Sequence, residues 1–287
     1  MTEREAPLVV ITGPTASGKS GLAMELAEKF GGEIICTDSR TVYRGMDIGT
    51  AKPTLEDRAR VPHHLLDVVE PDERFTVYDF QLRAKKSIVD IRTRGKIPFL
   101  VGGTGLYIDS VVLNYQLGDQ DTEKRQALSV KSTEELQTMI KKQHLKMPTN
   151  FKNKRHLIQV VVAGSYQSTA KLTPEVNTHV VAITTEKASL HQRIEKRAND
   201  MFATGVIDEA RHVAERYGWE SEAMSGNIYP ILRQVIEDRI TEQEALDRFI
   251  IRDRQLAKRQ MTWLKRHSFV QWKTLVDARL YIEHILN

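Results

Sequence analysis

Along most of the chain, short apolar runs alternate with longer segments in which apolar residues recur every three or four positions. The short runs are rich in valine and isoleucine, which favours buried strands, and the longer segments have the period of amphipathic helices. This alternation predicts an α/β fold with a parallel sheet flanked by helices on both faces. The strand-like runs are 8–12, 33–39 with a polar end, 96–101 and 178–183, with a shorter piece at 61–67, and the first helices are 21–30, 75–94 and 190–201.

Residues 116–172 interrupt the alternation. The part from 118 to 150 is polar, with lysine-rich helical patches and no strand-like run, and the apolar segment 152–162 fits either a helix or a strand. A buried strand returns only at 178–183. We therefore expect a mainly helical insertion over 116–172, with residues 1–115 and 173–287 forming the core.

The last third of the chain has helical periodicity throughout, and the predicted helices are 207–217, 229–239, 241–263 and 277–286. The formal net charge of the whole chain is only +4, but seven Lys or Arg residues fall between 252 and 273 against one acid, Asp253. Such a segment suits a polyanion, since each phosphate contact releases counterions. A solvated helix face is the alternative interpretation.

Composition excludes several protein classes. The chain has 287 residues, of which 40% are hydrophobic and 28% charged, as in ordinary soluble proteins. It has no uncharged apolar run near the length that crosses a bilayer, and its charged N-terminus shows no signal peptide. A single cysteine, Cys36, rules out an internal disulfide framework. We expect a cytoplasmic protein without membrane association.

The strand at 8–12 leads directly into a G-x-x-x-x-G-K-S motif that opens the first helix. This strand, loop and helix order is the context of a phosphate-binding P-loop, in which backbone N–H groups and the helix N-terminus surround phosphate oxygens. The lysine can reach terminal phosphate oxygens, and the last serine hydroxyl can complete a Mg²⁺ shell. The predicted phosphate-binding residues are Gly13, Pro14, Thr15, Ala16, Ser17, Gly18, Lys19 and Ser20, with Ser20 as the metal ligand.

Further candidate residues follow other predicted strands. Asp38 comes after the second strand, and Thr104 lies in a glycine turn after the third. The carboxyl ends of parallel strands share one edge of a sheet, so both residues are expected beside the P-loop. Asp38 could hold Mg²⁺ through water, act as a base or cap a helix. Arg193 and Arg197 share one helix face, where they could close over phosphates or pair with acids such as Glu195.

These residues alone leave the reaction open. A P-loop first suggests a nucleoside triphosphate, but an aspartate after the second strand is typical of small-molecule kinases rather than large ATPases. The pattern favours group transfer between a phosphorylated small molecule and an acceptor. It does not separate a kinase from a transferase whose leaving group is diphosphate.

Several sequence blocks resemble the tRNA dimethylallyltransferases, also called tRNA isopentenyltransferases. The most specific are Asp38-Ser-x-x-Val-Tyr-Arg-Gly-Met-Asp-Ile-Gly-Thr-Ala-Lys-Pro53 and Arg254-Gln-Leu-Ala-Lys-Arg-Gln-x-Thr-Trp263, which a generic P-loop kinase lacks. The remaining blocks, in family order, are the P-loop, Pro62–Leu65, Val101–Tyr107 and Leu190–Arg197.

The resemblance implies Mg²⁺-dependent transfer of a dimethylallyl group from dimethylallyl diphosphate to the exocyclic amine of the adenine 3′ of a tRNA anticodon. Diphosphate leaves, and the P-loop holds the prenyl donor rather than ATP. In that reading the catalytic residues are Asp38 as base, Thr104 near the diphosphate and Arg197 as its clamp. The insertion would grip the anticodon stem. The implied tRNA-binding residues are Asp38, Ser39, Arg40, Thr41, Thr104, Arg155, His156, Gln159, Tyr229, Lys258, Arg259 and Gln260.

This chain departs from the family pattern in its RNA-facing blocks. His156 and Gln159 stand where basic residues are usual, Asn227–Pro230 lacks the usual glycine and basic residue, and Arg40-Thr41 replaces a Met-Gln-like pair. The alternatives are an adenylate prenyltransferase, a P-loop small-molecule kinase and a tRNA-binding protein without activity. The basic C-terminal helix and the insertion argue against the first, and intact P-loop, Asp38 and Thr104 argue against the last. We expect a monomer.

Overall fold

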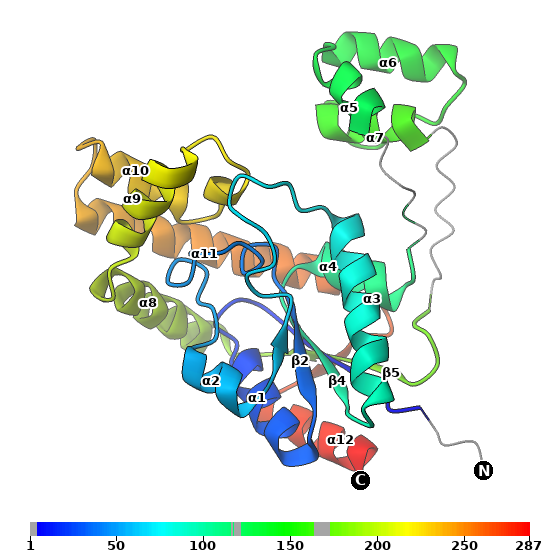
Figure 1. Ribbon diagram of the computed structural model, residues 1–287, viewed down its shortest axis with the longest axis vertical. Coiled ribbons are helices and arrows are strands. Elements are labelled where there is room, and N and C mark those ends of the chain that lie inside the picture. Colours follow the sequence, from blue (N-terminus) through cyan, green and yellow to red (C-terminus); the bar gives the residue numbers. More distant parts are fainter. Residues whose placement is uncertain (1–4, 116, 118–121, 164–172) are drawn as a thin grey trace. The chain divides into compact units, whose positions relative to one another are not determined.

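The computed structural model describes residues 5–115, 117, 122–163 and 173–287. It divides the chain into two compact units, one formed by Met1–Leu113 with Thr173–Asn287 and the other by Asn114–Leu172 (Figure 1). The sequence-based boundaries for the insertion were 116 and 172. Over the described ranges, no helix combines the length and apolar character needed to cross a membrane.

The first unit contains a parallel sheet with the strand order β3-β2-β4-β1-β5-β6. The predicted α/β fold is therefore confirmed, and β1, β2, β4 and β5 match the four main predicted strands. The edge strand β6 lies between the predicted helices 241–263 and 277–286 and was not predicted, because three residues are too short to show a period. The strands are β1 (Leu8–Thr12), β2 (Glu33–Thr37), β3 (His63–His64), β4 (Pro98–Gly102), β5 (Thr178–Ile183) and β6 (Gln271–Lys273).

Helices cover both faces of this sheet (Figure 1). Strand residues such as Val9, Ile11 and Phe99 pack with α1 and α12 in one apolar core. Alternate residues of the same strands point to the opposite face, where α3 contacts β2 and β4. The helices of this unit are α1 (Lys19–Phe30), α2 (Leu55–Arg60), α3 (Val77–Thr93), α4 (Gly105–Val112), α8 (Lys187–Ala203), α9 (Val206–Tyr217), α10 (Tyr229–Ile236), α11 (Glu242–Leu264) and α12 (Leu275–Leu286), with a short 3₁₀ turn at Ala223–Ser225.

Helices α8 to α11 pack on one another in sequence-local pairs, and α8 also packs along α11. Helix α11 further contacts α4, so the C-terminal helices reach the end of the sheet where β4 finishes. The helix predicted over 229–239 ends earlier, at Ile236, because Asp238 adopts a positive φ of 55°. A left-handed residue cannot continue a right-handed helix.

The second unit is helical, as predicted, and contains α5 (Thr122–Ser129), α6 (Thr133–Lys142) and α7 (Lys154–Ala163). A capping box formed by Ser132 and Glu135 starts α6. The segment 152–162, for which the sequence allowed a helix or a strand, is mostly helix because α7 begins at Lys154. The unit has its own small apolar core, built from Leu128, Leu136, Ile140, Leu157, Ile158 and Val161.

Candidate active site

The P-loop joins β1 to α1 as its motif predicts. Gly18 takes a φ of 89° at the N-terminus of α1, a left-handed conformation in which an added Cβ would also lie 3.0 Å from Leu275. Glycine is therefore required there for both conformational and steric reasons. The Lys19 ammonium donates to the carbonyl oxygen of Pro14 at 3.1 Å. The buried Ser17 hydroxyl has no hydrogen-bond partner in the described part of the chain, so a donor or acceptor is available inside the loop.

A second loop, Gly103-Thr104, follows β4 and lies beside the P-loop. Gln260 of α11 connects the two: its Oε1 accepts from the Thr15 N–H at 2.8 Å, and its Nε2 donates to the Gly103 carbonyl at 3.2 Å. A Cβ on Gly103 would lie 2.3 Å from that amide nitrogen, so glycine permits this approach. Gln260 was predicted only as a tRNA contact, and the structure gives it a role in joining both loops.

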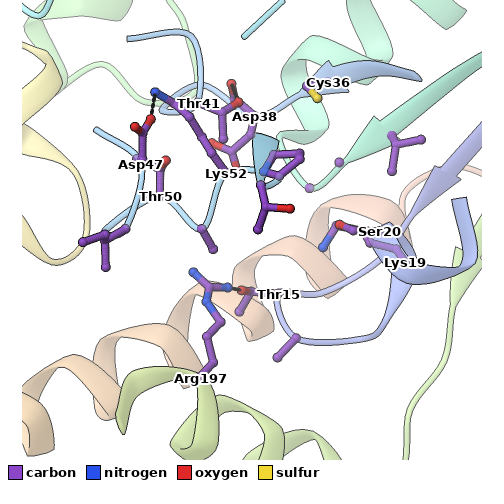
Figure 2. A pocket seen from close by; sticks show the side chains of 18 of the residues that line it. Thr15, Lys19, Ser20, Cys36, Asp38, Thr41, Asp47, Thr50, Lys52 and Arg197 are labelled. Atoms are coloured by element: carbon purple, nitrogen blue, oxygen red, sulfur yellow. Dashed lines mark hydrogen bonds and ion pairs between the residues drawn. The ribbon is translucent and has the colours of Figure 1, made fainter. Parts of the chain in front are cut away.

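Asp38 and Thr104 lie at the same edge of the sheet, as strand order predicts. The Thr104 hydroxyl accepts from the Ser39 N–H at 3.2 Å, and one Asp38 oxygen accepts from the Arg40 N–H at 2.8 Å. Thr41 is buried and its hydroxyl contacts the Asp38 carbonyl oxygen at 3.4 Å. Figure 2 shows the Asp38 side chain facing the same cavity as Lys19 and Ser20.

Two arginines of α8 approach the P-loop from the opposite wall of that cavity. The Arg197 guanidinium donates to the Thr15 hydroxyl, as Figure 2 shows, and Arg193 donates to the Ser17 carbonyl at 3.3 Å. Arg197 also lies 3.9 Å from the buried carboxylate of Asp253. The acid beside Arg197 is therefore Asp253 and not Glu195, which pairs with Arg254.

The cavity has a volume of about 1200 Å³ and combines cationic and apolar walls. Ammonium and guanidinium groups lie around the P-loop, and the rest of the lining mixes aliphatic side chains with polar and charged ones. Such a pocket can hold a small amphiphile that has an anionic head and an apolar tail. The cationic lining residues are Lys19, Arg44, Lys52, Arg58, Arg193, Lys196 and Arg197, the acidic ones are Asp38, Asp47, Asp67 and Asp200, and the apolar ones include Ile34, Ile48, Val101, Met201 and Leu256.

The charges of the cavity favour the binding of anions, and its cysteine is unsuited to nucleophilic chemistry. Burial, followed by the charge on Arg197, lowers the pKa of Lys19 to about 8, as expected for a cation kept in a cationic environment. Burial raises the pKa of the Cys36 thiol to about 12, so Cys36 serves packing rather than nucleophilic chemistry.

The loop between Thr41 and Pro53 forms one wall of the cavity and is fastened by residues that sequence analysis did not single out. Glu209 of α9 accepts the N–H groups of Asp47 and Ile48 at 2.6 Å each and that of Gly49 at 2.9 Å. The Lys52 ammonium is buried against Asp47 and Asp67. No motif marks Glu209, because these bonds join residues about 160 positions apart.

The predicted tRNA contacts on the C-terminal helices occupy different environments. Lys258 and Arg259 are exposed on α11, where they are accessible to RNA. Tyr229 is only 1% exposed, and its hydroxyl donates to Glu209 at 2.8 Å. Burial removes the Tyr229 side chain from any surface contact, so the structure favours a supporting role beneath the 41–53 loop. Arg40 is directed toward the 3₁₀ turn, where it donates to the Ser225 hydroxyl at 3.2 Å.

The predicted contacts in the second unit lie on α7. Arg155 and His156 are exposed near its start, whereas Gln159 is half-buried and accepts a hydrogen bond from Arg125 of α5. Two of the three are therefore accessible to a ligand of this unit.

The residues around the P-loop suit a metal held partly by its substrate. Among residues with described positions, no group of three or more His, Cys, Asp and Glu side chains could by itself hold a metal ion. The Ser20 hydroxyl and the Asp38 carboxylate line one cavity. Mg²⁺ usually binds through one or two protein oxygens, substrate phosphates and water, so this oxygen set fits it.

Comparison with known proteins gives one consistent result. Residues 41–267 match the family described as IPP transferase. The chain is 38% identical to the tRNA dimethylallyltransferase of Staphylococcus epidermidis, with 100% of this chain and 92% of that protein covered. Its fold superposes on the full-length tRNA isopentenylpyrophosphate transferase of Bacillus halodurans with a TM-score of 0.75 at 34% identity, covering 99% and 97% of the two chains.

A eukaryotic dimethylallyltransferase whose structures describe its action on tRNA also has this fold. Its TM-score is 0.79 at 24% identity, with 98% of this chain and 78% of that chain covered.

Proposed function

Because the chain belongs to the IPP transferase family, we propose that it is a tRNA dimethylallyltransferase, the activity for which its relatives are named. It transfers a dimethylallyl group from dimethylallyl diphosphate to the exocyclic amine of the adenine 3′ of the anticodon. The observation that carries this proposal is a single cavity that is lined by the P-loop, Lys19, Arg197 and Asp38 and whose walls are partly apolar. Such walls suit a prenyl diphosphate better than a nucleoside triphosphate.

The chemistry is one alkyl transfer. The adenine nitrogen attacks the first carbon of the dimethylallyl group, the carbon–oxygen bond breaks, and its electron pair goes to the departing diphosphate oxygen. The Asp38 carboxylate accepts the proton that the amine loses. Backbone N–H groups of the P-loop, Lys19 and Arg197 stabilise the negative charge that grows on the leaving group. Thr104 holds the backbone beside Asp38 and contacts the bound substrates.

Mg²⁺ would bind at Ser20 together with the diphosphate. When bound, it neutralises phosphate charge as a Lewis acid. Gly13 to Ser20 supply the cradle for the donor, and Asp38 faces the acceptor.

The tRNA is bound through basic and polar residues of both units. Lys258 and Arg259 contact phosphates from the exposed face of α11, and Asp38, Ser39, Arg40, Thr41 and Thr104 surround the target base. The insertion grips the anticodon stem with the exposed Arg155 and His156, while Gln159 is held by Arg125. The target adenine of the tRNA must leave the base stack to reach a cavity of this kind. A monomeric, cytoplasmic enzyme stays the expectation.

A transfer assay tests the proposal directly. The protein is incubated with Mg²⁺, labelled dimethylallyl diphosphate and either unmodified tRNA or AMP, and the products are identified by nucleoside mass spectrometry. We expect label in tRNA at the adenine 3′ of the anticodon. Label in AMP alone would instead identify an adenylate prenyltransferase, and the absence of transfer to either would contradict the proposal.

The role of Asp38 as the base can be tested by one substitution. Asp38→Asn keeps an acceptor for the Arg40 N–H but cannot take up a proton. We expect a fall in turnover of about 10²- to 10⁴-fold. The control is tRNA affinity, which should change less than turnover. A variant that turns over at the wild-type rate would remove Asp38 from the mechanism.

A further inference from the structure

The basic stretch from 252 to 273 contains one acid, Asp253, and the structure places that acid inside the molecule. Asp253 lies on α11 and is 1% exposed. Its Oδ1 accepts a hydrogen bond from the Asn227 amide at 3.0 Å, and its Oδ2 lies 3.9 Å from Arg197. Within the described ranges, neither Oδ2 nor the Arg197 Nε has a hydrogen-bond partner.

Asp253 is therefore not a fully satisfied ion-pair partner. A separation of 3.9 Å is an electrostatic contact rather than a hydrogen bond, and the Arg197 guanidinium makes its hydrogen bond to Thr15 of the P-loop instead. A residue whose task was to orient Arg197 would be expected to engage it through a bidentate pair. The observed geometry leaves the guanidinium bound to the P-loop and only in electrostatic contact with the carboxylate.

The charge on Asp253 reaches the phosphate site. The buried carboxylate lies 3.9 Å from the Arg197 guanidinium, and that guanidinium donates to Thr15 of the P-loop, so the negative charge acts directly on a cation of the phosphate site. Burying a carboxylate costs free energy, and an unpaired oxygen adds to that cost. A residue that carries this cost beside a cationic pocket is a candidate for adjusting how strongly the pocket holds anions.

The proposed reaction gives a reason for such an adjustment. Breaking the carbon–oxygen bond leaves inorganic diphosphate with one more anionic oxygen than the donor had. A purely cationic site would hold this product more tightly than the substrate. We propose that Asp253 is an internal counter-charge. Its negative charge weakens the binding of diphosphate and so speeds the release of diphosphate after each transfer. This inference rests on the proposed function.

The test is Asp253→Asn, which keeps the shape of the side chain and removes its charge. We expect inorganic diphosphate, measured by calorimetry, to bind on the order of tenfold more tightly, and inorganic phosphate to gain less because it carries less charge. Product inhibition by diphosphate should strengthen, and a burst of prenylated tRNA should precede a slower steady state. Asp247→Asn, an exposed change on the same helix, should alter neither affinity.

Two outcomes overturn the inference. Weaker binding of both anions by the Asp253 variant would mean that Asp253 only orients Arg197, and unchanged binding would mean that its charge does not act on the site. Asp253→Ser removes the same charge with a smaller side chain, and the two variants should agree. If thermal unfolding shows both unfolded at the assay temperature, Asp253 is structural and the inference fails. A wild-type protein that binds no diphosphate would instead contradict the proposed function itself.

Discussion

Burial and neighbouring charges change the pKa of individual side chains in the cavity. Lys19 is the clearest case, because burial and Arg197 bring its pKa to about 8, well below the ordinary lysine value. The free enzyme therefore changes the charge of its P-loop within an accessible pH range. An anion that binds next to Lys19 favours the protonated form, so binding above pH 8 is coupled to proton uptake.

We predict that the affinity for inorganic diphosphate falls as the pH rises above about 8. Calorimetry in buffers of different ionisation enthalpy should show proton uptake on binding above that pH and little below it. Lys19→Met should bind diphosphate more weakly at every pH and lose this dependence. A wild-type affinity that is flat between pH 7 and 9.5 (about one unit below and one and a half above the pKa) would contradict the pKa assignment.

The same shift has a consequence for stability with the opposite sign. The folded pKa of Lys19 lies below its unfolded value, so the unfolded chain binds more protons between about pH 8 and 10.5. In the absence of ligand, this residue therefore makes the free energy of unfolding rise with pH across that window. The Lys19→Met variant should lack that contribution in urea denaturation.

Among the elements, α11 contributes most to the assembly of the site. Gln260 joins the C-terminal part of this helix to both glycine loops, and Trp263 packs on Gly105 at the start of α4 while donating to the buried Asp109 at 2.7 Å. His267 also contacts Asp109, at 3.0 Å. The exposed basic face of this helix is thus rigidly connected to the phosphate site.

We predict that Gly105→Ala disturbs this packing. A Cβ at residue 105 would lie 2.2 Å from the Trp263 ring, so the indole must shift, and we expect a loss of about 1–3 kcal/mol in the free energy of unfolding. Gly21→Ala is the matched control, since it lies within α1 and nothing is within 4 Å of a Cβ added there; it should stabilise by roughly 0.5–1 kcal/mol. Urea denaturation measures both. Equal effects would show that the Trp263 contact is soft.

How far the sequence predicts this molecule depends on the range of the interaction. The strands, most helices, the P-loop and the placement of Asp38 beside Thr104 follow from local periodicity and from the rule that parallel strands end at one edge. The roles of Gln260 and Glu209 could not be predicted in this way. Each side chain bonds to residues far away in the sequence, and glutamine and glutamate are both common on helices. The family resemblance predicted Tyr229 as a tRNA contact, but its burial depends on tertiary packing, which the sequence alone does not show.

At the scale of the whole molecule, the chain consists of two compact units with separate apolar cores. The cavity and its charged residues belong entirely to the first unit. The exposed residues proposed to bind tRNA occur in both, on α11 and on α7. Donor binding and tRNA binding should therefore be separable by mutation.

We predict that Arg155→Ala and Lys258→Ala each weaken tRNA affinity several-fold without altering the Kd of inorganic diphosphate. Each lost phosphate contact should reduce the slope of log affinity against log salt concentration by about 0.7–0.9. Filter binding over a range of salt concentrations measures this slope. Lys196→Ala, in the cavity, is the converse control, because it should weaken diphosphate binding and leave the salt slope of tRNA binding unchanged. An unchanged slope in both variants would mean that these basic side chains are merely solvated.

The hydrogen bond from Thr15 to Gln260 has a consequence for the protein during its synthesis. The two residues are 245 positions apart, so at about 5–20 residues per second the P-loop leaves the ribosome roughly 12–50 s before the side chain that completes its neighbourhood. A nascent chain can thus form its first strand and helix early and still lack an assembled phosphate site. Catalytic competence arrives late in translation, when α11 folds against the sheet.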